Sequence, residues 1–203
     1  MKKVIFPIAL LAGSFNLFSQ EENTNQEKKT TYGFQFGTNL LRVVNSKNIP
    51  TDYKVTTGLG YKLGVQMERK LASSFSILSK AELSFNTLNF RNTIDAKNYS
   101  LNQNTINLMI HGSKQFNKIK KQPYFYVGPN LILPLLEKPN LNSITSQKPS
   151  FAIDFGFGLD FKKTKFIFSP EIKYSFGYNN VRNIETYTKS TFHTLSIIFN
   201  FKD

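Results

Sequence analysis

The feature that most constrains the fold is an unbroken alternation in the segment 150–161, SFAIDFGFGLDF. Every second position from Phe151 to Phe161 is large and apolar, and the positions between them hold alanine, aspartate and glycine. A period of two predicts a β-strand with two dissimilar faces. A soluble barrel would turn the aromatic face inward, whereas a membrane barrel would turn it outward to lipid. The function therefore depends on which face meets the surroundings.

Seven other segments show the same period and predict an all-β chain. They are 31–40, 58–68, 75–87, 102–112, 123–133, 165–178 and 191–201. Leu88 and Phe90 fall out of phase with the alternation before them, which predicts a bulge or a strand end near Thr87. Pro129 predicts a second bulge, because proline cannot donate a hydrogen bond to a neighbouring strand. The predicted fold is an eight-stranded antiparallel transmembrane β-barrel, an up-and-down meander.

The connections between these segments alternate in length. Long connections are expected around 42–56, 90–101, 134–150 and 179–190, and shorter ones at 70–73, 114–122 and 162–165. Long loops that alternate with short turns are typical of outer-membrane barrels, whose strands need about ten residues to cross the apolar band.

The N-terminal segment has the pattern of a secretory signal. Lys2 and Lys3 precede an apolar run that ends near Leu17. Proline, glycine and asparagine interrupt this run, which is shorter than the roughly 20 apolar residues of a spanning helix, so the alternative of a membrane anchor is disfavoured. We expect a signal peptide at 1–19, a disordered polar leader at 20–30 and a single barrel domain at 31–203.

The polar face of the predicted strands carries charges of both signs among many glycines. The charged residues expected to form a network in the lumen are Lys62, Glu68, Lys80, Glu82, Asp154, Asp160, Glu171 and Lys173. The interior of an eight-stranded barrel is barely wide enough for side chains. These charges are therefore expected to pair across the lumen and plug it, with glycines leaving room for the longer side chains.

The main alternative is a soluble periplasmic lipocalin-like carrier, with the aromatic face turned inward around an apolar ligand. Its solvated face would then be rich in glycine, serine and asparagine, where soluble surfaces carry dense Lys and Glu. A Lys or Arg on a lipid face costs about 2–4 kcal/mol near the midplane, and the best-phased apolar faces contain none. The sequence favours lipid outside and placement in the outer membrane.

Four segments together resemble the PorT-like outer-membrane β-barrel proteins of Bacteroidetes-type bacteria. They are PYFYVGPNLIL, FAIDFGFGLDF, SPEIKYSFGYNN and TFHTLSIIFNF, and the resemblance covers most of the mature chain. It implies a barrel in the outer membrane. Because some members of that family serve type IX secretion and gliding, it also implies secretion-apparatus proteins as partners of the long loops. Outer-membrane lipids and the insertion machinery are the other expected partners.

Little in the sequence predicts catalysis or a cofactor. His111 and His193 are the only histidines and there is no cysteine, so no metal cluster or bound cofactor is expected. Ser196 lies three positions from His193, which places the two on opposite strand faces and disfavours a lipid hydrolase acting at the barrel rim. The chain is therefore expected not to be an enzyme, with that hydrolase as a second alternative.

The formal net charge is +13, and the basic residues concentrate in turns and loops. No basic stripe with stacking aromatics is present, so nucleic acid is not an expected partner. Contact with anionic lipid head groups at both rims is one interpretation of these charges, and plain solvated turns are the other.

The last strand ends with two aromatic residues on one face. Phe199 and Phe201 are both expected to point outward, and we interpret them as a C-terminal assembly signal for the insertion machinery. This strand must also pair with the first one, because an open sheet edge cannot lie in lipid.

Overall fold

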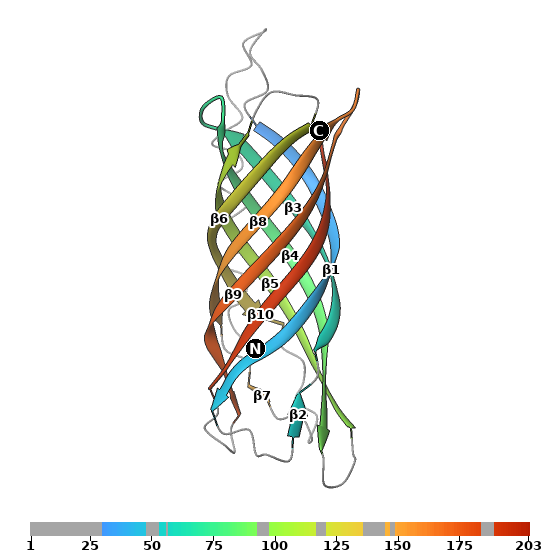
Figure 1. Ribbon diagram of the computed structural model, residues 1–203, viewed down its shortest axis with the longest axis vertical. Coiled ribbons are helices and arrows are strands. Elements are labelled where there is room, and N and C mark those ends of the chain that lie inside the picture. Colours follow the sequence, from blue (N-terminus) through green and yellow to red (C-terminus); the bar gives the residue numbers. More distant parts are fainter. Residues whose placement is uncertain are drawn as a thin grey trace, which may run out of the picture.

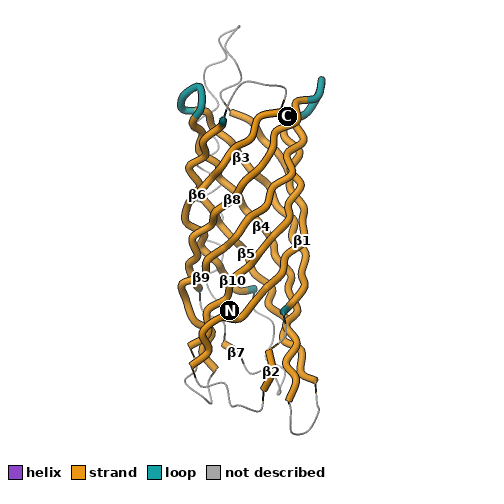
Figure 2. Tube along the Cα trace, in the orientation of Figure 1, coloured by secondary structure: helices purple, strands orange, loops and turns teal. Residues whose placement is uncertain are grey.

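The computed structural model describes residues 30–47, 53–55, 57–92, 98–116, 121–135, 145–146, 149–183 and 189–203. The predicted signal peptide and all of the predicted leader except Thr30 lie outside these ranges. The described residues form a tall, closed β-barrel with steeply inclined strands (Figures 1 and 2). None of them belongs to a helix that is long and apolar enough to cross a membrane.

Eight long strands and two short ones make up the sheet. The long strands are β1 (Thr30–Lys47), β3 (Gly58–Lys70), β4 (Phe75–Asn92), β5 (Asn98–Gln115), β6 (Lys121–Pro134), β8 (Ser150–Lys162), β9 (Ile167–Asn183) and β10 (Lys189–Lys202). The short strands are β2 (Tyr53–Val55) and β7 (Thr145–Ser146). They lie in two of the predicted long connections and pair with the ends of β4 and β9.

The barrel closes through pairing of the first and last strands, as predicted. β10 pairs antiparallel with both β9 and β1, and Phe36 lies opposite Phe199 in the β1–β10 register. The other long strands pair with their neighbours in chain order, which confirms the all-β, eight-stranded antiparallel meander. Because the barrel is closed, the backbone groups at both edges of the sheet have hydrogen-bonding partners along the barrel.

The connections separate the two ends of the barrel. At one end, residues 71–74, 116–120 and 163–166 join β3 to β4, β5 to β6 and β8 to β9; we call this the turn end. β2 and β7 lie at the opposite end, the loop end (Figure 1). β4 and β5 extend into the predicted connection 90–101, and β9 and β10 extend into the predicted connection 179–190, so these strands are longer than predicted.

The predicted interruption near Thr87 is wrong. β4 pairs with β5 in one register from Phe75 to Arg91. On its other side β3 is its partner as far as Thr87, and β2 is its partner from Phe90 onward. Because partners are present on both sides, the change of phase in the sequence does not end the strand.

The predicted bulge at Pro129 is also wrong. β6 keeps one continuous register with β8, in which Pro129 lies opposite Ile153. On the β5 side, pairing stops after Met109 and resumes at Gly112 in the same register. A Cβ at the neighbouring Gly128 would lie 2.2 Å from the carbonyl oxygen of β5 Ile110. The close approach that this glycine permits keeps the strands aligned across the missing proline donor.

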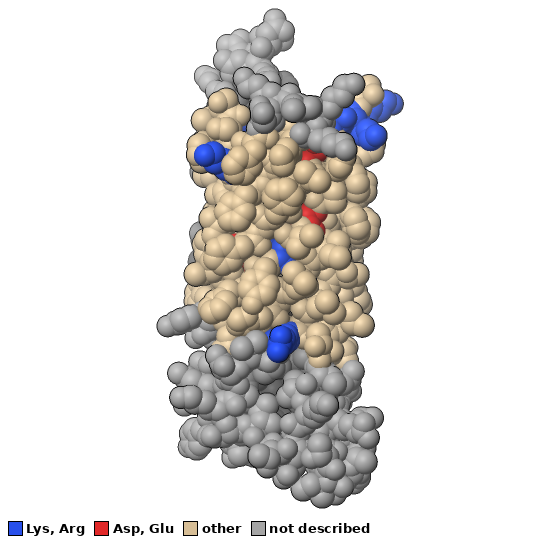
Figure 3. Space-filling view, in the orientation of Figure 1, with Lys and Arg blue, Asp and Glu red and all other residues tan. Residues whose placement is uncertain are grey.

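The aromatic and aliphatic faces of the strands point out of the barrel. Leu59 is 70% exposed, Val65 61% and Phe34 56%. Polar side chains occupy the alternate, inward positions. Most of the wall seen in Figure 3 is uncharged between the two ends. This answers the question raised by the segment 150–161: its aromatic face lies outside, so the lipocalin-like arrangement is wrong.

Candidate functional site

The lumen is the candidate site, because it gathers the charged residues of the chain's inward faces. All eight residues predicted for the lumen network lie inside the barrel, and none is more than 7% exposed. They come from β3, β4, β8 and β9, and β10 adds Lys202. Period-two alternation places them inside, since each occupies an inward position of its strand and most of them lie between two outward apolar residues.

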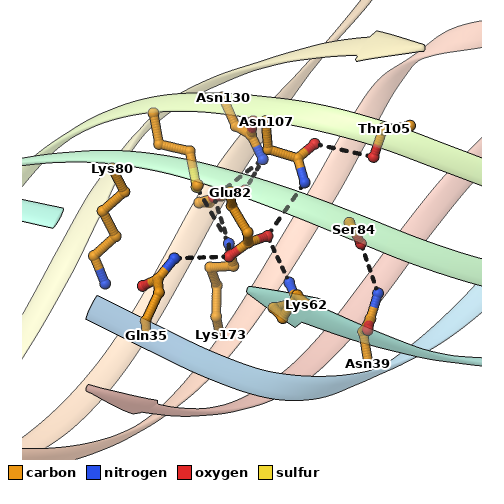
Figure 4. Close-up of polar contacts among 12 residues, drawn as sticks. Gln35, Asn39, Lys62, Lys80, Glu82, Ser84, Thr105, Asn107, Asn130 and Lys173 are labelled. Carbon is orange, nitrogen blue, oxygen red and sulfur yellow. Dashed lines mark hydrogen bonds and ion pairs between the residues drawn. The ribbon is translucent and has the colours of Figure 1, made fainter. Parts of the chain in front are cut away.

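Glu82 of β4 is the centre of the largest cluster (Figure 4). Its carboxylate lies 2.9 Å from Lys62 Nζ and 3.3 Å from Lys173 Nζ. The side-chain amides of Gln35 and Asn107 also donate to it, at 3.0 and 3.2 Å. Five strands therefore meet at one carboxylate that is 1% exposed.

Lys173 links this cluster to Asp154 on β8. The Asp154 carboxylate lies 3.5 Å from Lys173 Nζ and 3.3 Å from His111 Nε2. Asn130 Nδ2 lies 3.2 Å from both of its oxygens. We call Lys62, Glu82, Asp154 and Lys173 the central cluster; its two lysines balance its two carboxylates.

Glu171 of β9 forms a second cluster nearer the turn end. Lys80 Nζ lies 2.8 and 3.0 Å from its two carboxylate oxygens. The hydroxyls of Tyr124 and Tyr126, both on β6, donate to the same carboxylate at 2.5 and 2.9 Å. The Lys80 ammonium also lies 4.8 Å from the centroid of the Tyr126 ring. Charge-assisted hydrogen bonds of this kind are about twice as strong as neutral ones.

Two glycines make the tyrosine contacts possible. In the β6–β8 register, Tyr124 lies opposite Gly158 and Tyr126 opposite Gly156. A Cβ at Gly156 would lie 2.0 Å from Tyr126 Cζ, and one at Gly158 would lie 2.3 Å from Tyr124 Cζ. The two rings therefore cross β8 where it has no side chain and reach Glu171 on the next strand.

A third cluster occupies the turn end of the lumen. Lys202 Nζ lies 3.0 Å from both Glu68 Oε2 and Asp160 Oδ1. Ser169 and Gln115 also donate to Asp160, at 2.5 and 3.0 Å. The Lys202 ammonium lies 5.2 Å from the centroid of the Tyr124 ring, which connects this cluster to the one around Glu171.

Several lumen residues were missed by the sequence reasoning. Tyr124, Tyr126, His111 and Lys202 are each at most 4% exposed inside the barrel. Their strand positions carried a usable signal, since Tyr124 and Tyr126 share the phase of the inward Asn130, and Lys202 shares that of Asn200. The aromatic residues on both faces of 123–133 obscured that phase.

Phe199 and Phe201 point outward and lie in an aromatic cluster across the closing strands. The Phe201 ring centroid lies 5.1 Å from Phe34 of β1 and 5.2 Å from Phe168 of β9. The Phe199 ring lies 5.5 Å from Phe36 on β1. The two rings thus contact both neighbours of the last strand, and their role as an assembly signal stays a prediction.

The residues considered for catalysis and metal binding are not brought together. Ser196 is buried in the lumen, whereas His193 is outside and hydrogen-bonds the hydroxyl of Tyr174. Phe176 packs edge-on against the His193 ring at 4.6 Å. Among the described residues, no group of three or more His, Cys, Asp and Glu residues is arranged to hold a metal ion.

The central cluster supports a specific stability prediction. Glu82→Ala would leave Lys62 and Lys173 close together in the lumen without their shared carboxylate. Removing one partner of a buried ion pair costs about 3–5 kcal/mol, so the midpoint of urea unfolding in detergent micelles should fall sharply. Lys162→Ala, at an exposed turn-end position, is the control and should change stability by less than about 0.5 kcal/mol. Equal midpoints for the two variants would contradict the prediction.

Several solved structures are similar to this chain at low sequence identity. Neisserial surface protein A (NspA) is 12% identical, with 83% of this chain and 95% of that chain covered and a TM-score of 0.49. The outer membrane protein AlkL is also 12% identical, with 91% of this chain and 94% of that chain covered and a TM-score of 0.46. The attachment invasion locus protein Ail of Yersinia pestis is 11% identical, with 86% of this chain and 99% of that chain covered and a TM-score of 0.43.

No curated protein sequence matches this chain significantly. A family model does match: that of the outer membrane protein beta-barrel domain covers residues 18–183, most of the 203-residue chain. The outward apolar wall, the inward polar network and the closed antiparallel sheet agree with this match. The chain belongs to the outer membrane protein β-barrel domain family.

Proposed function

We propose that this protein is a non-enzymatic structural or interaction component of the outer membrane, with a lumen closed to solutes. The observation that carries the proposal is the lumen itself. Three ion-pair clusters, around Glu82, Glu171 and Lys202, follow one another along the barrel. In so narrow a barrel, side chains held in this way are expected to leave no continuous water path past the described residues.

The outward charges support the position of the barrel in the membrane. Arg69, which pairs with Thr30, is exposed at the turn end, and Arg42 is exposed toward the loop end. The 12 residue steps from Thr30 to Arg42 span roughly 30 Å along the barrel axis at the usual rise and tilt of such strands, close to the thickness of a hydrocarbon core. The ends of β4 and β5 continue past this band on the loop side.

The expected lipid partners fit the rims of the barrel. At the turn end, Lys114 Nζ lies 5.4 Å from the Phe75 ring centroid and 5.8 Å from that of Phe116, and all three side chains are exposed. Aromatic rings with adjacent cations are favoured at the level of lipid head groups. Contact with anionic head groups is therefore part of the proposal, as is recognition by the insertion machinery through β10.

More specifically, we propose that the protein is a PorT-like protein and that secretion-apparatus proteins bind it at the loop end. The four motifs quoted from the sequence support it, and they lie within β6, β8, β9 and β10. The absence of enzymatic activity is likewise proposed, supported by the separation of Ser196 from His193 on the two faces of β10.

Planar-bilayer recording tests the closed lumen. We expect the purified barrel to give no stable single-channel conductance, because the paired side chains fill its cross-section. The double variant Lys80→Ala/Glu171→Ala removes one charge pair and frees the volume of two long side chains, so it should raise the frequency of conducting events. Large, stable conductance of the unmodified protein would overturn the proposal in favour of a porin.

A further inference from the structure

The loop-end half of the lumen contains a small cavity that the ion pairs do not fill. Its volume is about 40 Å³. The central cluster supplies its floor through Lys62, Glu82 and Lys173. Its walls combine apolar side chains, such as Leu41 and Phe192, with amide and hydroxyl side chains: Ser84, Asn86, Gln103, Thr105, Asn107 and Asn130 (several labelled in Figure 4).

The floor of the cavity has no net charge. Lys62 and Lys173 are matched by Glu82 and Asp154, with N–O distances from 2.9 to 3.5 Å. A small anion or cation would gain little net attraction above such a floor and would still lose its hydration. The electrostatics therefore favour an uncharged ligand.

Two of the wall amides have unused acceptors. Gln103 Oε1 and Asn130 Oδ1 are buried and have no hydrogen-bond partner among the described residues. Asn130 is 2% exposed, and the hydrogen bonds from its Nδ2 to Asp154 hold its amide in place. A buried acceptor without a partner is costly, so a hydrogen-bond donor is expected to occupy this space.

We propose that this cavity binds the hydroxyl-bearing end of a neutral carbohydrate that enters from the loop side. Hydroxyl groups can donate to the two unused carbonyl oxygens and accept from the neighbouring amide and hydroxyl groups. The volume corresponds to about three water-sized groups, which suits a hydroxymethyl arm or two adjacent hydroxyls and not a whole sugar ring. The site goes beyond the proposed closed lumen, since the floor of the cavity blocks passage further into the barrel.

NMR titration of the full-length mature protein tests this site. The ¹⁵N-labelled barrel would be held in lauryldimethylamine oxide micelles, which carry no sugar, and titrated with D-glucose and with maltotetraose. Saturable shifts of the Asn107 and Asn130 side-chain amide signals, with a dissociation constant in the millimolar range, are expected for at least one of them. Saturation of these shifts by D-glucose would identify the ligand as a free sugar, and saturation by maltotetraose would identify it as the end of a glycan. Sodium phosphate and choline chloride should not produce saturable shifts.

A matched pair of variants locates the binding. Gln103→Leu removes a wall amide and should weaken binding about fivefold, the effect of one hydrogen bond. Gln66→Leu removes a similarly inward amide in the turn-end half of the lumen and should leave binding unchanged. Thr105→Val, nearly isosteric, is the second wall variant if Gln103→Leu does not fold.

Three outcomes would overturn the site. They are shifts that stay linear with sugar concentration, as a cavity filled by water alone would give; equal affinity in the wall and control variants; and saturable binding of phosphate or choline instead of sugar. None of them affects the conductance test, so the site and the closed lumen can fail independently.

Discussion

Replacing Gly156 with valine is expected to destabilise the barrel by about 3–5 kcal/mol. The new Cβ would fall 2.0 Å from Tyr126 Cζ, and the added methyl groups need still more room. The Tyr126 ring has nowhere to move, since it is fully buried and stacks on His111 at 4.8 Å. Overpacking alone typically costs 1–3 kcal/mol, and loss of the hydroxyl bond to Glu171 adds about 1.5–3.

Gly112 provides the matched control for this change. It faces outward on β5, and the nearest atom to a Cβ there would be 3.9 Å away. Gly112→Val should therefore leave the urea midpoint within about 0.5 kcal/mol of the unmodified protein. Adding Tyr126→Ala to Gly156→Val should recover part of the loss by making room for the valine. If Gly156→Val and Gly112→Val unfold at the same midpoint, the tyrosine–glycine fit does not stabilise this barrel.

The double change Phe199→Ser/Phe201→Ser is expected to reduce the amount of barrel in the outer membrane at least tenfold. The rings of Phe199 and Phe201 contact Phe34 and Phe36 on β1 and Phe168 on β9. Losing both removes roughly 4 kcal/mol of apolar burial from the strand that closes the barrel. It also removes the proposed signal for the insertion machinery. Quantifying heat-modifiable protein in outer-membrane fractions measures the effect.

The double variant Phe155→Ser/Phe157→Ser on β8 separates the contribution of apolar burial from that of the assembly signal. These rings also face outward, and the composition change is identical, but β8 does not close the barrel. If the C-terminal pair acts as an assembly signal, its loss should reduce outer-membrane yield much more than the β8 change. Equal yields for the two double variants would mean that Phe199 and Phe201 contribute only apolar area. A normal outer-membrane yield of the Phe199→Ser/Phe201→Ser variant would contradict a role of these two residues in barrel assembly.

The alternation of residue types was enough to predict the strands and their faces. The segment 150–161 lies within β8 (Ser150–Lys162), with Phe155 outward and Asp154 inward as the pattern indicates. The even number of long strands and the pairing of the last with the first followed as well. The face that a side chain occupies is a local property, because it depends only on the neighbours of that residue in the sequence.

Strand length, register and the partners across the lumen depended on the tertiary structure. β4 continues past Thr87 because β2 and β5 provide partners, and Pro129 is accommodated because β8 holds β6 in register. Lys202 meets Glu68 from 134 positions away in the chain. Tyr126 reaches Glu171 only because the register places Gly156 opposite it. Such contacts require several strands to align at once, and the period within any one strand carries no information about its alignment with the others.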